Sequence, residues 1–149
     1  MQMNTDEQTP IQYFSEDTVF NIDNSNTVSD WIIQTIQSEN GYLSFINFIF
    51  CSDTYLLQIN QEYLQHDTYT DIVTFDYNNS QIESDIFISI DRIKENASKL
   101  NIGFEQELHR VIIHGVLHLL GYGDKSKEDK ALMTEKENQY LILKGYKNI

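Results

Sequence analysis

The chain has 149 residues, 40% of them hydrophobic, which is enough to bury the core of one folded domain and excludes a disordered protein. The formal net charge of −13 argues against a general nucleic-acid binder, because phosphate contacts need lysine and arginine. No apolar run is long enough to span a membrane, and the start is polar and acidic, so we expect no secretory signal. Cys51 is the single cysteine, which excludes an internal disulfide and favours a buried, unreactive thiol. We therefore expect one domain over residues 1–149, in the cytoplasm.

The first half of the chain predicts two strands and two helices. Val28, Trp31 and Ile32 fall at helical spacing, and Asn40-Gly41 ends that helix. The following segment is rich in aromatic and β-branched residues on both faces, as in a buried strand. Ser52 is a suitable N-cap for the next helix. The predicted elements are a short strand at residues 11–14, a helix at 27–39, a strand at 42–50 and a helix containing Leu56, Ile59 and Tyr63.

The second half predicts two strands followed by three helices. Residues 72–77 and 86–90 alternate as strands do, and Asn78-Asn79-Ser80 between them favours a turn, so we expect a hairpin. A hairpin means that the sheet is not wholly parallel. We predict an α+β fold with a small mixed sheet of about four strands packed by about five helices. The first of the three helices contains Ile93, Ala97 and Leu100, and the second covers residues 105–120. The third begins at Ser126, with Asp129 three residues on, and runs to about Lys144.

The stretch from Val111 to Asp124 holds the residues best suited to chemistry. Between Val111 and Leu120 every residue is apolar or glycine except His114 and His118, as expected for a buried helix. The two histidines are four residues apart, so they lie on one face of the helix, about 40° apart around its axis. This geometry suits two imidazoles that bind the same metal ion.

The residues after this helix predict a third ligand. Gly121 is placed to end the helix in a left-handed conformation, and Gly123 gives a second permissive position. Such a turn brings Asp124 back beside His118. Two neutral imidazoles, one carboxylate and an open fourth position are typical of a catalytic zinc site. We therefore predict that His114, His118 and Asp124 bind one ion, which is zinc or another divalent metal.

Two alternatives stand beside this prediction. Both histidines could be core residues bonded to backbone or water, although each one left unpaired would cost about 1–3 kcal/mol. His109 lies on a different face from His114, and we expect a surface or capping role for it. The His-x-x-x-His-x-x-Gly-x-x-Asp spacing also matches zinc metalloproteases, in which a glutamate general base follows the first histidine. Gly115 occupies that position, so a metalloprotease-like hydrolase is the second choice.

Three segments resemble the YbeY family, the metal-dependent endoribonucleases of ribosomal RNA maturation. The family signature His-Gly-x-Leu-His-Leu-x-Gly-Tyr-Asp-His corresponds to His114–Asp124. The second segment contains Ile59-Asn60, Tyr63 and residues 70–75, the third is residues 85–89, and all follow the family order within about residues 41–143. The resemblance implies a zinc endoribonuclease that cuts single-stranded RNA through a metal-bound water or a metal-polarised phosphate. It also implies a place in ribosome biogenesis and quality control, with RNA and the ribosome or its proteins as partners, and no DNA or membrane.

Two positions depart from the family pattern. Asp124 replaces the third family histidine, and because aspartate is a competent ligand, we expect a site with altered affinity or metal preference. Leu64 replaces an arginine thought to act on the phosphate, which removes a charge that would stabilise the pentacovalent state. A non-catalytic ribosome-assembly factor is therefore a further alternative. No residue stands out as general base. Asp71 is a candidate for shaping the site. His66, Arg92 or Lys125 could take the role of the missing arginine on the phosphate.

Basic residues recur near the metal motif despite the acidic composition. If they gather on one face, they form a local basic patch for RNA; otherwise they are ordinary salt-bridged helix positions. The acidic body would also suit docking to basic ribosomal proteins, with the ribosome supplying RNA specificity. The residues in question are Arg92, Lys94, Lys99, Arg110, Lys125, Lys127 and Lys130.

Overall fold

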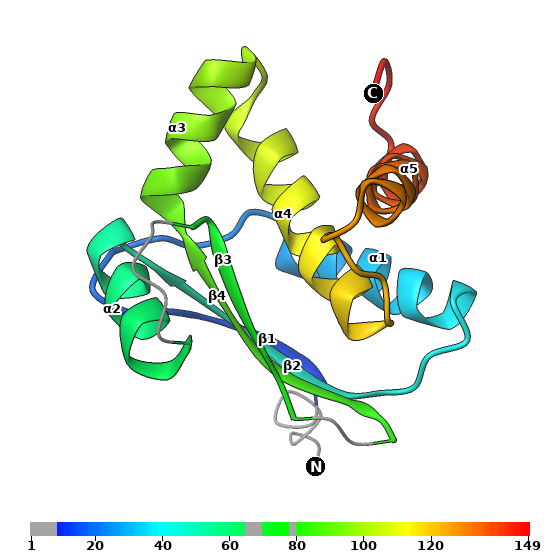
Figure 1. The fold of residues 1–149 in the computed structure, drawn as a ribbon, viewed down its shortest axis with the longest axis horizontal. Coiled ribbons are helices and arrows are strands. Elements are labelled where there is room, and N and C mark those ends of the chain that lie inside the picture. Colours follow the sequence, from blue (N-terminus) through cyan, green and yellow to red (C-terminus); the bar gives the residue numbers. More distant parts are fainter. Residues whose placement is uncertain (1–8, 65–69, 78–79) are drawn as a thin grey trace.

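The computed structural model describes residues 9–64, 70–77 and 80–149, which form four strands and five helices (Figure 1). The predicted α+β fold, with its numbers of strands and helices, is confirmed. In chain order the elements are β1 (Ile11–Ser15), α1 (Ser25–Ser38), β2 (Leu43–Cys51), α2 (Asp53–Leu64), β3 (Ile72–Asp76), β4 (Ile82–Ser89), α3 (Ile90–Leu100), α4 (Phe104–Leu119) and α5 (Lys127–Lys144).

The sheet is mixed, with strand order β1-β2-β4-β3. β2 pairs in parallel with both β1 and β4, which explains why its sequence is apolar on both faces. β3 runs antiparallel to β4, with Thr74 opposite Ile86, so the predicted pairing of these two strands is confirmed. Asn78 and Asn79 of the predicted turn lie outside the described residues.

The predicted bounds of β4 were wrong at both ends. The strand begins at Ile82, four residues earlier than expected, and ends at Ser89. Its early part was missed because Ser84 and Asp85 interrupt the apolar pattern, although Ser84 is fully buried. Ile90 belongs to α3 instead, because the Ser89 hydroxyl accepts a hydrogen bond from the Arg92 amide and caps that helix at once.

Helices cover the two faces of the sheet unequally, and most of the core lies on one side. α1 and α4 lie on one face, with α5 outside α4, while α2 packs against the opposite face (Figure 1). The larger core joins Phe48 and Ile86 of the sheet to Ile112 of α4, all fully buried. The smaller core joins Leu56 of α2 to Val73. α4 is therefore fixed between the sheet and α5, which gives it a rigid position.

The predicted surface or capping role of His109 was wrong. The side chain is 2% exposed, because α5 and the residues after it cover that side of α4. Its Nδ1 lies 2.7 Å from the Tyr146 hydroxyl, and its ring lies 5.6 Å from the Trp31 ring. Burial lowers the pKa of His109 to about 4, and the charge of Lys144 acts in the same direction.

The neutral His109 is expected to make stability depend on pH. The unfolded chain binds a proton near pH 6.5, whereas folded His109 binds one only near pH 4, so its contribution is complete above pH 6.5 and is lost as the pH falls to 4. The loss amounts to as much as about 3 kcal/mol. Urea unfolding at pH 7 and pH 4.5 tests this in the wild type and in His109→Gln. The same pH dependence in both proteins would contradict it.

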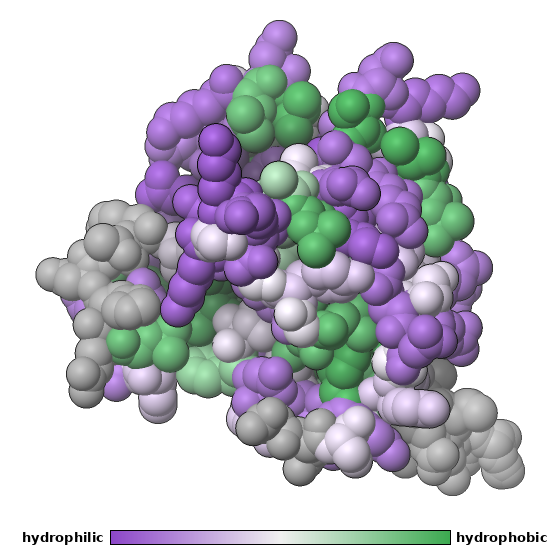
Figure 2. Space-filling model, turned by 45° about the vertical axis from the view of Figure 1, so that its right-hand side comes forward, coloured by the Kyte–Doolittle hydropathy of each residue, from purple (hydrophilic) through white to green (hydrophobic). Residues whose placement is uncertain are grey.

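On the face that Figure 2 shows, hydrophilic residues cover much of the surface and apolar residues form separate patches. Among the described helices, none is both long and apolar enough to cross a bilayer. Cys51 is buried, as expected, and burial together with nearby carboxylates raises the pKa of its thiol to about 12. The thiol is therefore unreactive near neutral pH.

Candidate metal centre

α4 brings the side chains of His114 and His118 together. Their ring centroids lie 4.5 Å apart and their Nε2 atoms 3.0 Å apart. Ile112, Ile113 and Val116 are fully buried on the other sides of the helix, which fixes its rotation. The imidazoles are 23% and 31% exposed, so an ion can reach them from solvent.

The turn after α4 places Asp124. Gly121 adopts a positive φ of 104°, as predicted, its amide donates to the His118 carbonyl, and the Tyr122 amide donates to the Leu117 carbonyl. These two bonds define a Schellman motif, which reverses the chain at the helix end. Gly123, the second permissive position, does not adopt a positive φ, and a Cβ there would lie 3.2 Å from Asp129 Oδ2.

The three ligand atoms have the spacing of a metal site. Asp124 Oδ2 lies 3.2 Å from His118 Nε2 and 3.4 Å from His114 Nε2. In a tetrahedral zinc site with bonds of about 2.0–2.1 Å, neighbouring ligand atoms are about 3.3 Å apart. Among the described residues, the group of three side chains that could hold a metal ion is His114, His118 and Asp124. Their ligand atoms all lie within 4.8 Å of one another. The donor set and its spacing fit a divalent ion such as zinc.

Each imidazole has a hydrogen-bond partner on its other nitrogen. His118 Nδ1 donates to the Tyr122 carbonyl at 2.8 Å, and His114 Nδ1 donates to Glu137 Oε2 at 2.7 Å. Both Nε2 atoms are therefore left as acceptors that face Asp124. Burial alone would lower the pKa of His114, but the hydrogen bond and charge of Glu137 raise it above its ordinary value.

The turn that carries Asp124 is anchored to two helices through Glu39, which follows α1. The Tyr122 hydroxyl donates to Glu39 Oε1 at 2.6 Å, Lys136 donates to Oε2 at 3.1 Å, and Tyr140 also donates to Oε2. Burial would raise the pKa of Glu39, but these hydrogen bonds outweigh it and hold the pKa below its usual value. The ionised carboxylate thus ties the turn to α1 and α5.

The three candidate ligands lie in the wall of a pocket of about 720 Å³. Its opposite wall comes from the end of α2 and from β3, so residues far apart in the sequence meet around the histidines. A volume of this size matches a small-molecule or nucleotide site. The lining residues are Asn60, Leu64, Thr70, Asp71, Ile72, Val73, Thr74, Asp76, His114, His118, Leu119, Asp124 and Lys125.

The other candidate residues occupy different places. Asp71, directly before β3, lines this pocket and a second hollow that shares His114, and burial raises the pKa of its carboxyl. Lys125 also lines the pocket. Arg92 instead pairs with Asp53 at 2.6 Å and with Glu95 at 3.3 Å, between α2 and α3. His66 lies outside the described residues.

Of the two alternatives for the basic residues, three of the seven residues fit ordinary salt-bridged positions. Arg92, Lys99 and Arg110 each form an ion pair with a glutamate or aspartate, as ordinary salt-bridged positions do. Of the seven basic residues near the motif, Lys125 is the one that lines the metal pocket. The described basic residues therefore contribute one lysine to this pocket and do not form a broad basic surface around it.

Sequence reasoning missed Glu137, and with it the partner that Arg110 pairs with. Glu137 Oε1 accepts from Arg110 Nη1 at 2.8 Å, while its other oxygen binds His114. A signal for it was present, because Glu137 lies among Met133, Tyr140 and Leu141 on the buried side of α5. A glutamate at an apolar helical position needs a polar partner, and α4 supplies two.

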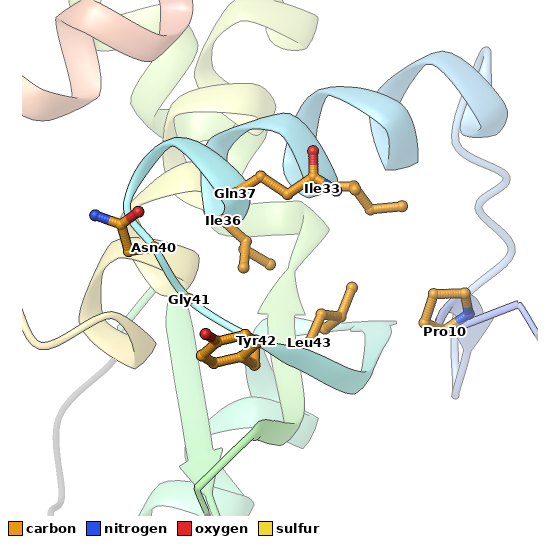
Figure 3. A pocket seen from close by; sticks show the side chains of 8 residues that line it. All are labelled: Pro10, Ile33, Ile36, Gln37, Asn40, Gly41, Tyr42 and Leu43. Atoms are coloured by element: carbon orange, nitrogen blue, oxygen red, sulfur yellow. The ribbon is translucent and has the colours of Figure 1, made fainter.

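A separate hollow of about 520 Å³ lies where the end of α1 meets the start of β2 (Figure 3). Ile33, Ile36 and Leu43 line it, together with Pro10 and Tyr42. The described residues around it include no histidine, carboxylate or amine. The candidate ligands His114, His118 and Asp124 line a different pocket.

The comparisons with known proteins agree with this fold. The family model for "Endoribonuclease YbeY" matches residues 11–144. A protein of that name from Amoebophilus asiaticus is 48% identical over 93% of this chain and 96% of its own length, and one from Flavobacterium psychrophilum is 49% identical over 87% and 94%. The chain therefore belongs to the endoribonuclease YbeY family, and the resemblance seen in the sequence is confirmed.

A solved structure supports the same assignment. The solution structure of TM1509 from Thermotoga maritima superposes with a TM-score of 0.64 and 27% identity, covering 88% of this chain and 86% of that protein. The mixed four-stranded sheet is thus shared with a distant relative.

Proposed function

We propose that this chain is a zinc-dependent endoribonuclease that cuts single-stranded RNA in ribosomal RNA maturation, ribosome biogenesis and quality control in the cytoplasm. Family membership supports the nuclease activity. The observation that carries the proposal is the meeting of His114, His118 and Asp124 in the wall of one pocket. RNA and the ribosome or its proteins are the proposed partners.

His114, His118 and Asp124 would hold the ion, and their combined charge is −1 when both imidazoles are neutral. A bound divalent ion supplies Lewis acidity towards a phosphoryl oxygen and favours ionisation of water. With Zn²⁺ bound, these ligands would leave a net charge of +1, which would favour a phosphodiester at this wall of the pocket. Lys125 adds a second positive charge beside Asp124.

Asp71 is the proposed proton acceptor. It lines the same pocket as His114, and its backbone is fixed because its carbonyl accepts from the Ser89 amide at 3.0 Å. Burial raises the pKa of its carboxyl, although the charges of His114 and Arg92 oppose this. A carboxyl whose pKa is moved towards neutrality is better suited to accept and return a proton.

Cleavage of labelled RNA tests the proposed function. Zinc-loaded protein is incubated with a single-stranded RNA and with the same strand in a perfect duplex, beside protein stripped of metal by a chelator. We expect internal cuts in the single strand, little cutting of the duplex and loss of activity on stripping. Equal RNA loss with loaded and stripped protein would reject metal-dependent cleavage.

Lys125→Ala is expected to weaken RNA binding about equally for all sequences, because Lys125 contacts phosphate. The slope of log affinity against log salt should fall by about 1. Fluorescence anisotropy with a short single-stranded RNA at several salt concentrations measures both effects. Lys94→Ala, an exposed lysine of α3 outside the pocket lining, is the matched control and should leave the slope unchanged. An unchanged slope in Lys125→Ala would exclude the contact.

The metalloprotease alternative is not favoured by the packing of Gly115. A Cβ there would lie 2.9 Å from Ile72 Cδ1 and 3.4 Å from Ile86 Cδ1, so this position faces the sheet closely. We expect Gly115→Glu to lower the free energy of unfolding by about 3 kcal/mol or more, because a carboxylate would enter an apolar contact. Denaturant unfolding measures this. A variant that is as stable as the wild type and also cleaves casein would support the metalloprotease alternative.

The second candidate function is a ribosome-assembly factor that binds without cutting. It is favoured by Leu64, which lines the pocket where the family pattern has an arginine. RNA cleavage by the wild type would count against it. Rescue of a processing-defective strain by His114→Ala would support it, because that variant lacks a metal ligand but keeps the outer surface.

A further inference from the structure

We propose that Glu137, held by Arg110, is a positioning residue that orients His114 and strengthens metal binding. This inference rests on the metal binding proposed above. Glu137 belongs to α5 and is separated from His114 by 23 residues. It lies outside the three-ligand group, so its effect on the metal is exerted through the imidazole.

The contacts of Glu137 fix the carboxylate on both sides. Its side chain is 9% exposed, Oε2 accepts from His114 Nδ1 at 2.7 Å, and Oε1 accepts from Arg110 Nη1 at 2.8 Å. Arg110 Nη2 also donates to Asn138 Oδ1 at 2.8 Å, which holds the guanidinium in place. A buried carboxylate with both oxygens bonded has little freedom to turn.

Packing alone does not explain a carboxylate at this position. The neighbouring buried side chains of α5 include Met133 and Leu141, and an apolar residue among them would avoid the cost of burying a charge. The hydrogen bonds that Glu137 accepts from Arg110 and from the His114 imidazole offset that cost. The arrangement therefore points to a role at His114 in addition to helix packing.

The hydrogen bond determines which nitrogen of His114 is free. With the proton on Nδ1 and directed to Glu137, the Nε2 lone pair faces His118 and Asp124. A carboxylate acceptor also makes the imidazole a better electron donor. Arg110 balances the charge of Glu137, so the positive charge expected at the loaded site is retained.

The two metal-binding imidazoles have unequal support. His118 Nδ1 donates to a neutral backbone carbonyl, that of Tyr122, which no side-chain substitution removes. His114 depends on a side chain that can be replaced. A change at Glu137 should therefore weaken metal binding without abolishing it.

Zinc affinity tests the proposal in Glu137→Gln, which keeps the size of the side chain and loses its charge. Competition against a chromophoric chelator should show binding about 10–100-fold weaker than in the wild type. Glu135→Gln, an exposed position of the same helix with the same change in charge, is the matched control and should bind zinc like the wild type. Glu137→Gln affinity within about threefold of the wild type would overturn the proposal. Absence of zinc binding by the wild type would overturn the proposed metal site as well.

Two further measurements separate positioning from folding. Arg110→Gln should weaken zinc binding in the same direction, and the double variant should bind no more weakly than Glu137→Gln alone, because Arg110 acts through Glu137. In the zinc-loaded wild type, long-range ¹H–¹⁵N correlations should place the His114 proton on Nδ1 and the metal on Nε2. The reverse assignment would overturn the proposal even if Glu137→Gln failed to fold.

Discussion

Replacing His114 with alanine is expected to remove tight zinc binding and to slow cleavage of single-stranded RNA by at least about 1,000-fold. Substitutions of residues that only contact a metal ligand typically lower metal affinity or activity about 10–100-fold. Loss of a ligand itself should therefore lower them further. His114 is also the point where α4, α5 and Asp124 meet. Zinc affinity and single-turnover cleavage of a labelled RNA measure the two effects.

Two controls make the His114→Ala result specific. Wild-type protein stripped of metal should match the variant in cleavage rate, because both lack the ion. Glu105→Ala, an exposed position near the start of the same helix, should keep wild-type affinity and rate. Cleavage by His114→Ala at a rate near that of the wild type would exclude a catalytic role for the metal.

Asp124→Asn is expected to lower zinc affinity by more than about 100-fold, because it removes the anionic ligand while keeping the shape of the side chain. Asp124 Oδ2 lies within 3.4 Å of both His114 Nε2 and His118 Nε2, so the amide would occupy the same position without the charge. Asp124→His should retain binding, because imidazole is also a zinc ligand. Competition with a chelator, run with zinc and cobalt, measures affinity and metal preference together.

Asp129→Asn provides the matched control for Asp124→Asn. Asp129 is exposed in the first turn of α5, five residues beyond Asp124. It undergoes the same chemical change outside the ligand group and should leave zinc affinity unchanged. Equal affinity in Asp124→Asn and Asp129→Asn would remove Asp124 from the ligand set and leave the two histidines alone.

The helix and turn around the metal ligands were predictable because their geometry is local. The i, i+4 spacing of His114 and His118 places them on one face of any α-helix. Gly121 can take the positive φ that ends the helix, and the Schellman bonds follow from that conformation. Asp124 is only six residues from His118, so no distant part of the chain is needed to bring them together.

The support around the ligands was not predictable, because it depends on how α4 and α5 pack. Glu137 meets His114 only when the two helices lie side by side, and no local rule gives that register. His109 was misplaced for the same reason, since Tyr146 and Trp31 reach it from distant segments. The start of β4 was missed because buried Ser84 carries no apolar signal.

The two departures from the family pattern, Leu64 and Asp124, line the same pocket. Leu64 and Lys125 line the same pocket, so the pocket lacks the family arginine at residue 64 but has a cation beside Asp124. Asp124 occupies the place of the third family histidine and satisfies the spacing of a ligand. The spacing of the three candidate ligands is thus kept with Asp124, and Lys125 is the cation that lines the pocket in which residue 64 is leucine.

Binding of one divalent ion by His114, His118 and Asp124 is tested most directly by the metal content of the protein. Wild type and His114→Ala are purified without chelator, offered zinc at neutral pH and freed of unbound metal before elemental analysis. We expect about one equivalent of divalent metal per wild-type chain and about one tenth or less in the variant. A wild-type chain with less than about one third of an equivalent, or a variant that retains as much metal as the wild type, would contradict the site.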